Sequence, residues 1–319
     1  MSWLARRFLT IPVAEVTFAR RGFHAGDAQT CSWLEHIGRT FLTGYHAALE
    51  HDPEALGRGL DAVDRDVRGF AFEGAAMALT LLDALSPWSR NRRMTALLRG
   101  RGAAHVYMVH VGAGWALARL RRGARPPAHL DPLLGWLAVD GYGFHEGYFA
   151  WRHYVRACRP PVRVNGYERR VFDQGLGRSL WFVDGADPAR IAAAVARFSP
   201  DRHSDLWSGV GLAGAYAGGA TETALSALAR AAGAYRACLA QGAAFAATAR
   251  QRAGNSSPST EAACRAFCAM SAAEAAQLVE AALQDLHAEG PVPAYEVWRS
   301  RIRRCFAVEA AAPPAGRSA

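Results

Sequence analysis

Five side chains of this sequence combine an ionisable group with a setting in which it could transfer protons: Glu73, His110, His145, Glu146 and Asp173. Glu73 lies in an otherwise apolar run, where a carboxyl group has to be paired, protonated or directed into a polar cavity. As a buried acid with a raised pKa it would suit general acid–base catalysis. As the partner of an arginine such as Arg68 it would only brace the start of a helix. Both interpretations stay open.

The segment 140–149 is the densest in polar and aromatic groups, with the His145–Glu146 pair and three glycines. Glycines let a backbone turn tightly and approach a ligand closely, which makes the segment a candidate site. A plain glycine-rich turn before a helix would have the same composition. Arg178 could hold a carboxylate or a phosphate. Eight residues form the predicted substrate-binding set: Tyr107, Trp115, Tyr142, Phe144, Arg178, Trp181, Asp205 and Trp207.

Several reaction classes are excluded by residues and motifs that the sequence lacks. No lysine occurs, which removes Schiff-base chemistry, pyridoxal-phosphate attachment and the P-loop. The GxSxG, HExxH, ExxH and DDxxD motifs are also absent. His105 and His110 do not share a helix face, so we predict no metal site. The sequence leaves the cofactor unknown. The GxGxxG string at 209–214 follows a polar stretch, which favours helix packing over dinucleotide binding.

Composition narrows the classes of partner. The formal net charge is +9, but the arginine pairs are scattered, which indicates a solvated basic surface and no nucleic-acid interface. The six cysteines lack CxxC spacing and follow no secretory signal, so we expect free thiols in a reducing cytoplasm. No uncharged apolar run is long enough for a transmembrane segment, and none is expected.

Five landmarks of the first half recur in the same order in the second half, at offsets of 121 to 135 residues. One match would be chance, but five in order predict an internal duplication. Aspartate–proline predicts a helix start in each copy, and small residues three and four apart predict closely packed helices. The matched landmarks are Gly22–Gly26 with Gly143–Gly147, Phe41 and Gly44 with Phe172 and Gly175, Asp52-Pro53 with Asp187-Pro188, Phe72 and Gly74 with Trp207 and Gly209, and Gly112–Ala116 with Gly242–Ala246.

These patterns predict a mainly α fold with two diverged copies of one helical unit, packed as a pseudo-symmetric pair, and a C-terminal helical extension. A minor strand content is expected at residues 14–19 and 180–183. The predicted divisions are 1–120 for the first copy with its N-terminal segment, 121–140 for a linker and lead-in helix, 141–254 for the second copy, 255–309 for the extension and 310–319 for a disordered tail.

The duplication also separates residues needed for the fold from candidates for chemistry. A polar residue shared by both copies, such as His145 with its counterpart His24, favours a structural role. A polar residue present in one copy alone is the better candidate for chemistry. The unshared pairs are Glu73 with Ser208, His110 with Ala240, and Glu146 with Ala25.

Five long stretches carry a family resemblance that covers roughly residues 10–255: FEGAAMALTLLD, HVYMVHVGAGWALARL, LDPLLGWLAVDGYGFHEGYF, RRVFDQGLGRSLWFV and DLWSGVGLAGAYAGG. They closely resemble a bacterial family of unknown function encoded beside enediyne polyketide synthases. The resemblance implies a role, within a small gene cassette, in turning a linear conjugated polyene into an enediyne core. It brings no particular reaction and no catalytic residues.

Two hypotheses follow from the residues and the resemblance together. Smooth alanine–glycine helix faces with aromatic landmarks could enclose a long apolar ligand. In the first hypothesis the protein is an enzyme that acts on the polyene by proton transfer, isomerisation or ring closure. In the second it is a binding or scaffold protein that shields the polyene or docks other proteins of the cassette.

Overall fold

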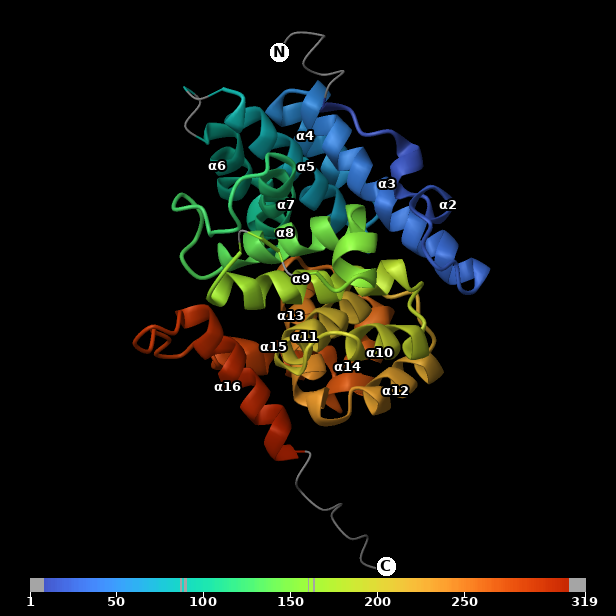
Figure 1. Ribbon diagram of the computed structural model, residues 1–319. Coiled ribbons are helices and arrows are strands. Elements are labelled where there is room, and N and C mark those ends of the chain that lie inside the picture. Colours follow the sequence, from blue (N-terminus) through green and yellow to red (C-terminus); the bar gives the residue numbers. More distant parts are fainter. Residues whose placement is uncertain (1–8, 87, 89–90, 160, 163, 310–319) are drawn as a thin grey trace, which may run out of the picture.

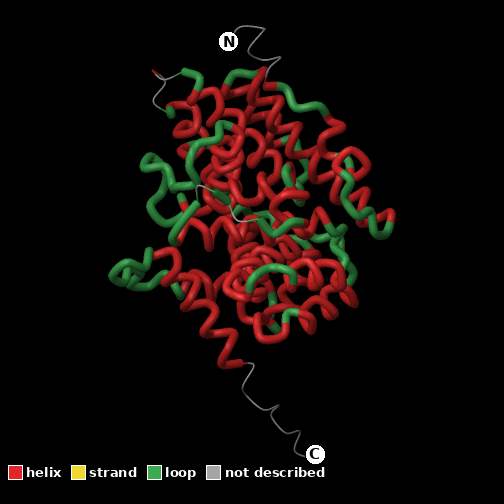
Figure 2. The backbone as a smooth tube through the Cα atoms, viewed as in Figure 1, coloured by secondary structure: helices red, strands yellow, loops and turns green. Residues whose placement is uncertain are grey.

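The computed structural model describes residues 9–86, 88, 91–159, 161–162 and 164–309, and in this part of the chain helices dominate (Figure 1). Figure 2 shows helices joined by loops throughout, with no strand among the described residues. The mainly α prediction is confirmed. Strands at 14–19 and 180–183 are wrong: the first region forms two short helices around a cap at Thr17, and the second is the last turn of a long helix. The predicted tail, 310–319, lies outside the described residues.

One series of long helices stacks side by side through the molecule, each packed against the next. In Figure 1 the stack runs from the N-terminal helices, through α8 and α9 across the middle, to the C-terminal helices. In stacking order its members are α3 (Ala28–Glu50), α5 (Arg68–Ala84), α7 (Val106–Arg119), α8 (Trp136–Phe149), α9 (Tyr167–Val183), α11 (Pro200–Ala217), α13 (Arg236–Arg252) and α15 (Ala272–Ala281).

The remaining helices connect the members of the stack or cover it. They are η1 (Val13–Val16), α2 (Phe18–Arg21), α4 (Pro53–Asp61), α6 (Arg92–Arg99), η3 (Arg101–Ala103), the π-helical turn η4 (Arg152–Arg156), α10 (Pro188–Ala196), α12 (Glu222–Ala231), η5 (Gly233–Tyr235), α14 (Pro258–Cys268) and α16 (Ala294–Glu309). The aspartate–proline prediction is confirmed, because the Asp52 carboxylate accepts two backbone N–H groups at the start of α4 and that of Asp187 accepts one at α10.

Glycines set the spacing of the stack. A Cβ atom on Gly209 would be driven into the carbonyl oxygen of Gln174 on α9, and one on Gly177 into that of Leu206 on α11. Such reciprocal contacts let two backbones approach more closely than side chains would permit. The pairs lie between consecutive helices and are Gly44 with Gly74, Gly114 with Gly141, Gly143 with Gly175, Gly177 with Gly209, and Gly211 with Gly242. The predicted close packing at Gly74 and Gly209 is therefore confirmed.

The two-copy duplication stays a prediction. The helices α3, α4, α5, α6, η3 and α7 are followed by a second run, α9, α10, α11, α12, η5 and α13, of similar lengths. If the two runs correspond, the contact of Gly44 with Gly74 matches the contact of Gly177 with Gly209. Gly44 is then equivalent to Gly177, whereas the sequence landmarks matched it to Gly175, two residues earlier. The predicted boundary at 140/141 falls inside α8. No helix in the described part of the chain is both long and apolar enough to cross a membrane.

Candidate active site

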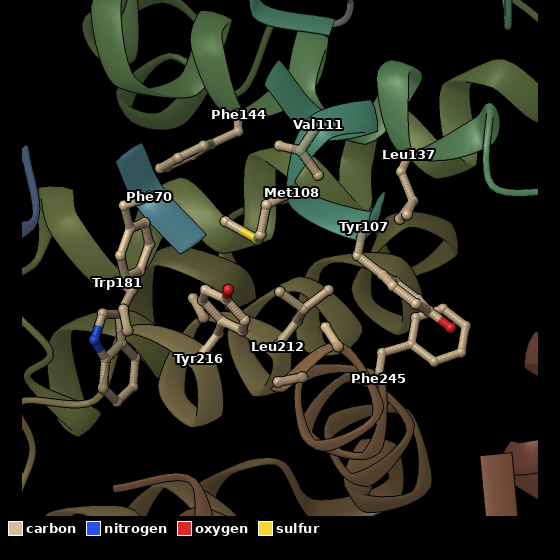
Figure 3. Close-up of a cluster of buried hydrophobic side chains, with 14 of the residues drawn as sticks. Phe70, Tyr107, Met108, Val111, Leu137, Phe144, Trp181, Leu212, Tyr216 and Phe245 are labelled. Carbon is tan, nitrogen blue, oxygen red and sulfur yellow. The ribbon is translucent and has the colours of Figure 1, made fainter. Parts of the chain in front are cut away.

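A narrow apolar slot of about 40 Å³ lies between the segment at residues 11–16 and helices α3, α5, α7, α8 and α9. Glu73 is the one acidic residue among the described residues that line it, and aromatic rings make up much of the wall. Phe70 and Phe144 of this wall belong to a wider cluster of buried side chains (Figure 3). The lining residues are Ile11, Val16, Ile37, Gly38, Phe41, Leu42, Phe70, Glu73, Trp115, Phe144, Tyr148, Phe149 and Phe182.

The lone acid of the slot is held by a single neutral hydrogen bond. Nε1–H of Trp115 donates to Oε1 of Glu73 at 2.9 Å. The nearest cation, Nη2 of Arg178, lies 3.9 Å from the same oxygen. Burial raises the pKa of Glu73 to about 7, since the attraction of Arg178 and the hydrogen bond from Trp115 offset only part of the desolvation, and Asp140 opposes them. A carboxyl group with this pKa can both donate and accept a proton near neutral pH.

A polar ladder continues from Glu73 through the stack. Arg178 donates to Asp140, and Nε2 of Gln174 donates to Asp140 at 2.8 Å. The hydroxyl group of Ser208 lies 3.5 Å from Oε1 of Gln174 and donates to Gln241 at 2.8 Å. Every one of these side chains is buried. The ladder therefore links α5, α8, α9, α11 and α13 through groups that are costly to bury unpaired, and it fixes the position of Arg178.

The ladder ends on α16, which the sequence analysis placed in the C-terminal extension. The fully buried Arg299 donates to Asp205 at 2.7 Å and to Glu296 at 3.2 Å, and its Nε lies 3.4 Å from Gln241. Arg170 also binds Asp205, at 3.0 Å. The predicted substrate-binding residue Asp205 is thus engaged in an internal ion-pair network, and α16 is part of the packed core.

His145 packs against Trp115 and is paired with its neighbour Glu146. Nδ1 of His145 is 3.0 Å from Oε1 of Glu146, and the imidazole packs edge-to-face on Trp115 with ring centroids 5.7 Å apart. Nε2 of His145 is buried and has no hydrogen-bond partner among the described residues. His145 therefore supports two residues of the wall, Trp115 and Phe149.

The other two predicted catalytic residues lie elsewhere. Nδ1 of His110 is 2.7 Å from the carbonyl oxygen of Val106 on its own helix, and burial lowers the pKa of His110, which favours a neutral ring. Asp173 accepts two hydrogen bonds from Arg202, at 2.5 and 2.9 Å, in a buried ion pair. Neither side chain lines the slot.

The structure brings three predicted substrate-binding residues to the site, namely Trp115 and Phe144 in the wall and Arg178 beside Glu73. Nε1 of Trp181 donates to the carbonyl oxygen of Gly218 at 2.9 Å, which gives this tryptophan a role in the core. The remaining three, Tyr107, Tyr142 and Trp207, are buried or half-buried on α7, α8 and α11 and do not line the slot.

Sequence reasoning missed the ladder residues Asp140, Gln174, Ser208 and Gln241. A signal for them exists: each directly precedes the first glycine of a Gly-x-Gly or Gly-x-Ala string, as Glu73 does. Along the chain this string recurs at intervals of 29 to 38 residues, and in α7 the ladder position is the apolar Val111. Consecutive helices of the stack thus direct the residue before the first glycine of the string towards the interior.

A second cavity, of about 660 Å³, lies at the C-terminal ends of α3 and α5. Leucines from α3, α4, α5 and α6 line much of it, and charged groups such as Asp52 and Arg93 stand at its edge. None of the predicted site residues lines this cleft. No group of three or more metal-ligating side chains occurs in the described residues.

Comparison with known proteins places the chain in a family. The family model described as protein of unknown function (DUF1702) matches residues 1–306, so the chain belongs to that family. Neither a curated protein nor a solved structure matches the chain.

Proposed function

We propose that the protein binds a linear conjugated polyene in the aromatic slot and moves protons on it, with Glu73 as the acid and base. One observation carries the proposal: a single buried carboxyl group, with a pKa of about 7, faces a wall of aromatic and aliphatic side chains. A polar substrate would lose its hydration in such a slot without gaining partners. An apolar unsaturated chain has no hydrogen bonds to water to lose, and it supplies carbon atoms that can be protonated.

The proposed chemistry is isomerisation. The protonated Glu73 donates its proton to one carbon of the polyene and leaves a delocalised cation on the chain. The resulting carboxylate then removes a proton from a different carbon, so the double bonds shift and the atoms balance. Faces of Trp115 and Phe144 would stabilise the cation, because aromatic rings attract positive charge. Ring closure of the same cation before the second proton transfer would give a cyclic isomer.

The proposed biological setting is enediyne biosynthesis. The long glycine–aromatic motifs resemble those of the family encoded beside enediyne polyketide synthases, whose product would be the conjugated polyene. The polyene or a related polyketide is then the small-molecule partner, and other proteins of such a cassette are the proposed macromolecular partners. Proton transfer leaves the oxidation state of the polyene unchanged, so this step needs neither an oxidant nor a reductant.

Access to the slot requires movement of the N-terminal segment. Ile11 and Val16 form part of the wall, and a volume of about 40 Å³ holds only a few water-sized molecules. Arg21 anchors this segment through Glu15 at 2.8 Å and through the carbonyl oxygen of Phe149 at 2.7 Å. Binding of a polyene would displace Ile11, which precedes these anchors, while Glu15 and Arg21 act as the hinge.

The experiment is incubation of the protein with a linear conjugated polyene, followed by absorption spectroscopy and chromatography. Wild-type protein should shift the absorption bands of the polyene, and Glu73→Gln should bind it without changing it. Asp173→Asn, outside the slot, is the control for loss of a buried carboxylate. Equal conversion by wild type and Glu73→Gln would refute the proposal.

A second candidate function is binding without chemistry. The leucine-lined cleft favours it, because its volume suits a small molecule and no acid with a raised pKa is among its lining residues. Quenching of tryptophan fluorescence by the polyene with no conversion, in wild type and in Glu73→Gln alike, would support this alternative.

A further inference from the structure

Arg178 lies between two carboxyl groups and is bound to one of them. Its Nη1 donates to Asp140, whereas its Nη2 stays 3.9 Å from Glu73. The ring of Phe144 covers the guanidinium group at 4.7 Å from its centroid. All three charged groups are buried. With one cation for two carboxyl groups in a dry interior, only one of the two can be a compensated carboxylate.

We propose that Asp140 is a positioning residue for Glu73: by binding Arg178 it keeps the guanidinium group off the carboxyl group that faces the slot. The arrangement itself is a property of the free protein, and its meaning for catalysis rests on the function proposed above. Without the Asp140 carboxylate, Arg178 would need to move by only about 1 Å to form a direct ion pair with Glu73.

The surroundings explain why Asp140 holds the cation. Asp140 accepts a second hydrogen bond, from Gln174, which fixes its carboxylate on the side of Arg178. Glu73 is held in place by Trp115. The ladder position of α7 between them is Val111, which offers no polar group, so Arg178 alone spans the gap.

Three groups from the packed helices act on the charge of Glu73, namely Arg178 on α9, Asp140 on α8 and the indole N–H of Trp115 on α7. The hydroxyl group of Tyr216 on α11 also faces Glu73, whose charge helps to raise the pKa of that tyrosine. Removing the charge of Asp140 takes away a repulsion and frees a cation. Both changes favour the ionised form of Glu73.

The test reads the protonation of Glu73 through its hydrogen-bond donor, without any substrate. The protein has nine tryptophans, and the indole N–H resonance of Trp115 is assigned as the one that disappears in Trp115→Phe. Its chemical shift should follow the titration of Glu73 in wild type and should not change with pH in the same way in Glu73→Gln. In Asp140→Asn the midpoint should fall by about 1 to 3 pH units. Asp140→Glu, which keeps the charge, should restore it towards the wild-type value.

An unchanged or raised midpoint in Asp140→Asn would overturn the proposal. Stability gives a second test that does not depend on the titration. Asp140→Asn and Glu73→Gln each leave Arg178 one carboxyl group, whereas the double variant leaves none, so the double variant should be far less stable than the sum of the two single effects predicts. Additive losses would also overturn it. If the midpoint moves as expected but polyene is not converted, the positioning role stands and the proposed function fails.

Discussion

The indole N–H of Trp115 donates a 2.9 Å hydrogen bond to Glu73, and both residues line the same apolar slot. The acid is therefore oriented by a donor that is itself part of the wall. A hydrogen bond to a carboxylate favours the ionised form, so this contact lowers a pKa that burial has raised. The indole ring of Trp115 consequently affects both the orientation and the pKa of the Glu73 carboxyl group.

Trp115→Phe should raise the pKa of Glu73 further above 7, by about one unit, because it removes the donor and keeps an aromatic ring. Carboxyl ¹³C resonances of glutamate-labelled protein, with Glu73→Gln for assignment, measure the shift. Trp33→Phe is the matched control, since that indole donates to the carbonyl oxygen of Ala217 and does not line the slot. A Glu73 pKa that stays unchanged in Trp115→Phe would show that the hydrogen bond is not important in solution.

Glu73→Gln should change how stability depends on pH. The folded pKa of about 7 lies above the ordinary value of 4.5, so the folded state holds a proton that the unfolded state releases in this window. The contribution of Glu73 to stability is full below pH 4.5 and is lost as the pH rises through 7. Relative to wild type, Glu73→Gln should therefore gain roughly 2 to 3 kcal/mol in free energy of unfolding between pH 5 and 8.

Urea denaturation of both proteins at several pH values measures this difference. All other titrating groups are common to the two proteins, so their contributions cancel to first order. A difference that stays constant from pH 5 to 8 would mean that Glu73 titrates at its ordinary pKa.

Gly209→Ala should destabilise the protein by about 3 kcal/mol or more, because the added methyl group meets the backbone of Gln174 and Arg178 and cannot be accommodated by a rotamer change. Gly59→Ala is the control within a helix, since its Cβ would point into open space. That variant should be more stable than wild type by about 0.5 to 1 kcal/mol. Chemical denaturation of the two variants side by side decides the point. Equal effects would contradict close packing at Gly209.

Arg299→Met should cost about 3 to 5 kcal/mol, because it leaves the buried carboxylates of Asp205 and Glu296 short of a cation. Arg265→Met removes an exposed partner of Glu261 and should change stability by about 0.5 kcal/mol at most. Denaturant midpoints of the two variants test the claim that α16 is part of the core. A small effect of Arg299→Met would instead indicate a loosely attached extension.

The fold was predictable mainly from patterns of residues that are close together in the sequence. Asp52 and Asp187 before prolines marked helix starts because capping depends on neighbouring residues alone. The strand expectation at 14–19 failed for one local and one non-local reason. Glu15 there binds Arg20 and Arg21, and Val16 packs on Gly38 from a distant part of the sequence.

The site was predictable in part. Glu73 stood out because it is a lone acid in an apolar run, and Trp115 and Phe144 stood out as aromatic landmarks. Asp140 and Gln174 did not, since each resembles an ordinary polar residue in its own segment. The stacking of α8 on α9 makes them neighbours in a buried ladder, and it gives a meaning to the glycine strings that follow both residues in the sequence.

The most direct test of the account is proton exchange between solvent and polyene. Wild-type protein is incubated with a linear conjugated polyene in D₂O, and the recovered polyene is analysed by mass spectrometry. We expect deuterium at carbon positions of the product with wild type and none above background with Glu73→Gln, because the acidic proton of Glu73, including the one it removes from the polyene, exchanges with solvent between turnovers. Deuterium incorporation that is equal in both proteins, or a product with shifted double bonds from Glu73→Gln, would contradict Glu73 as the proton donor.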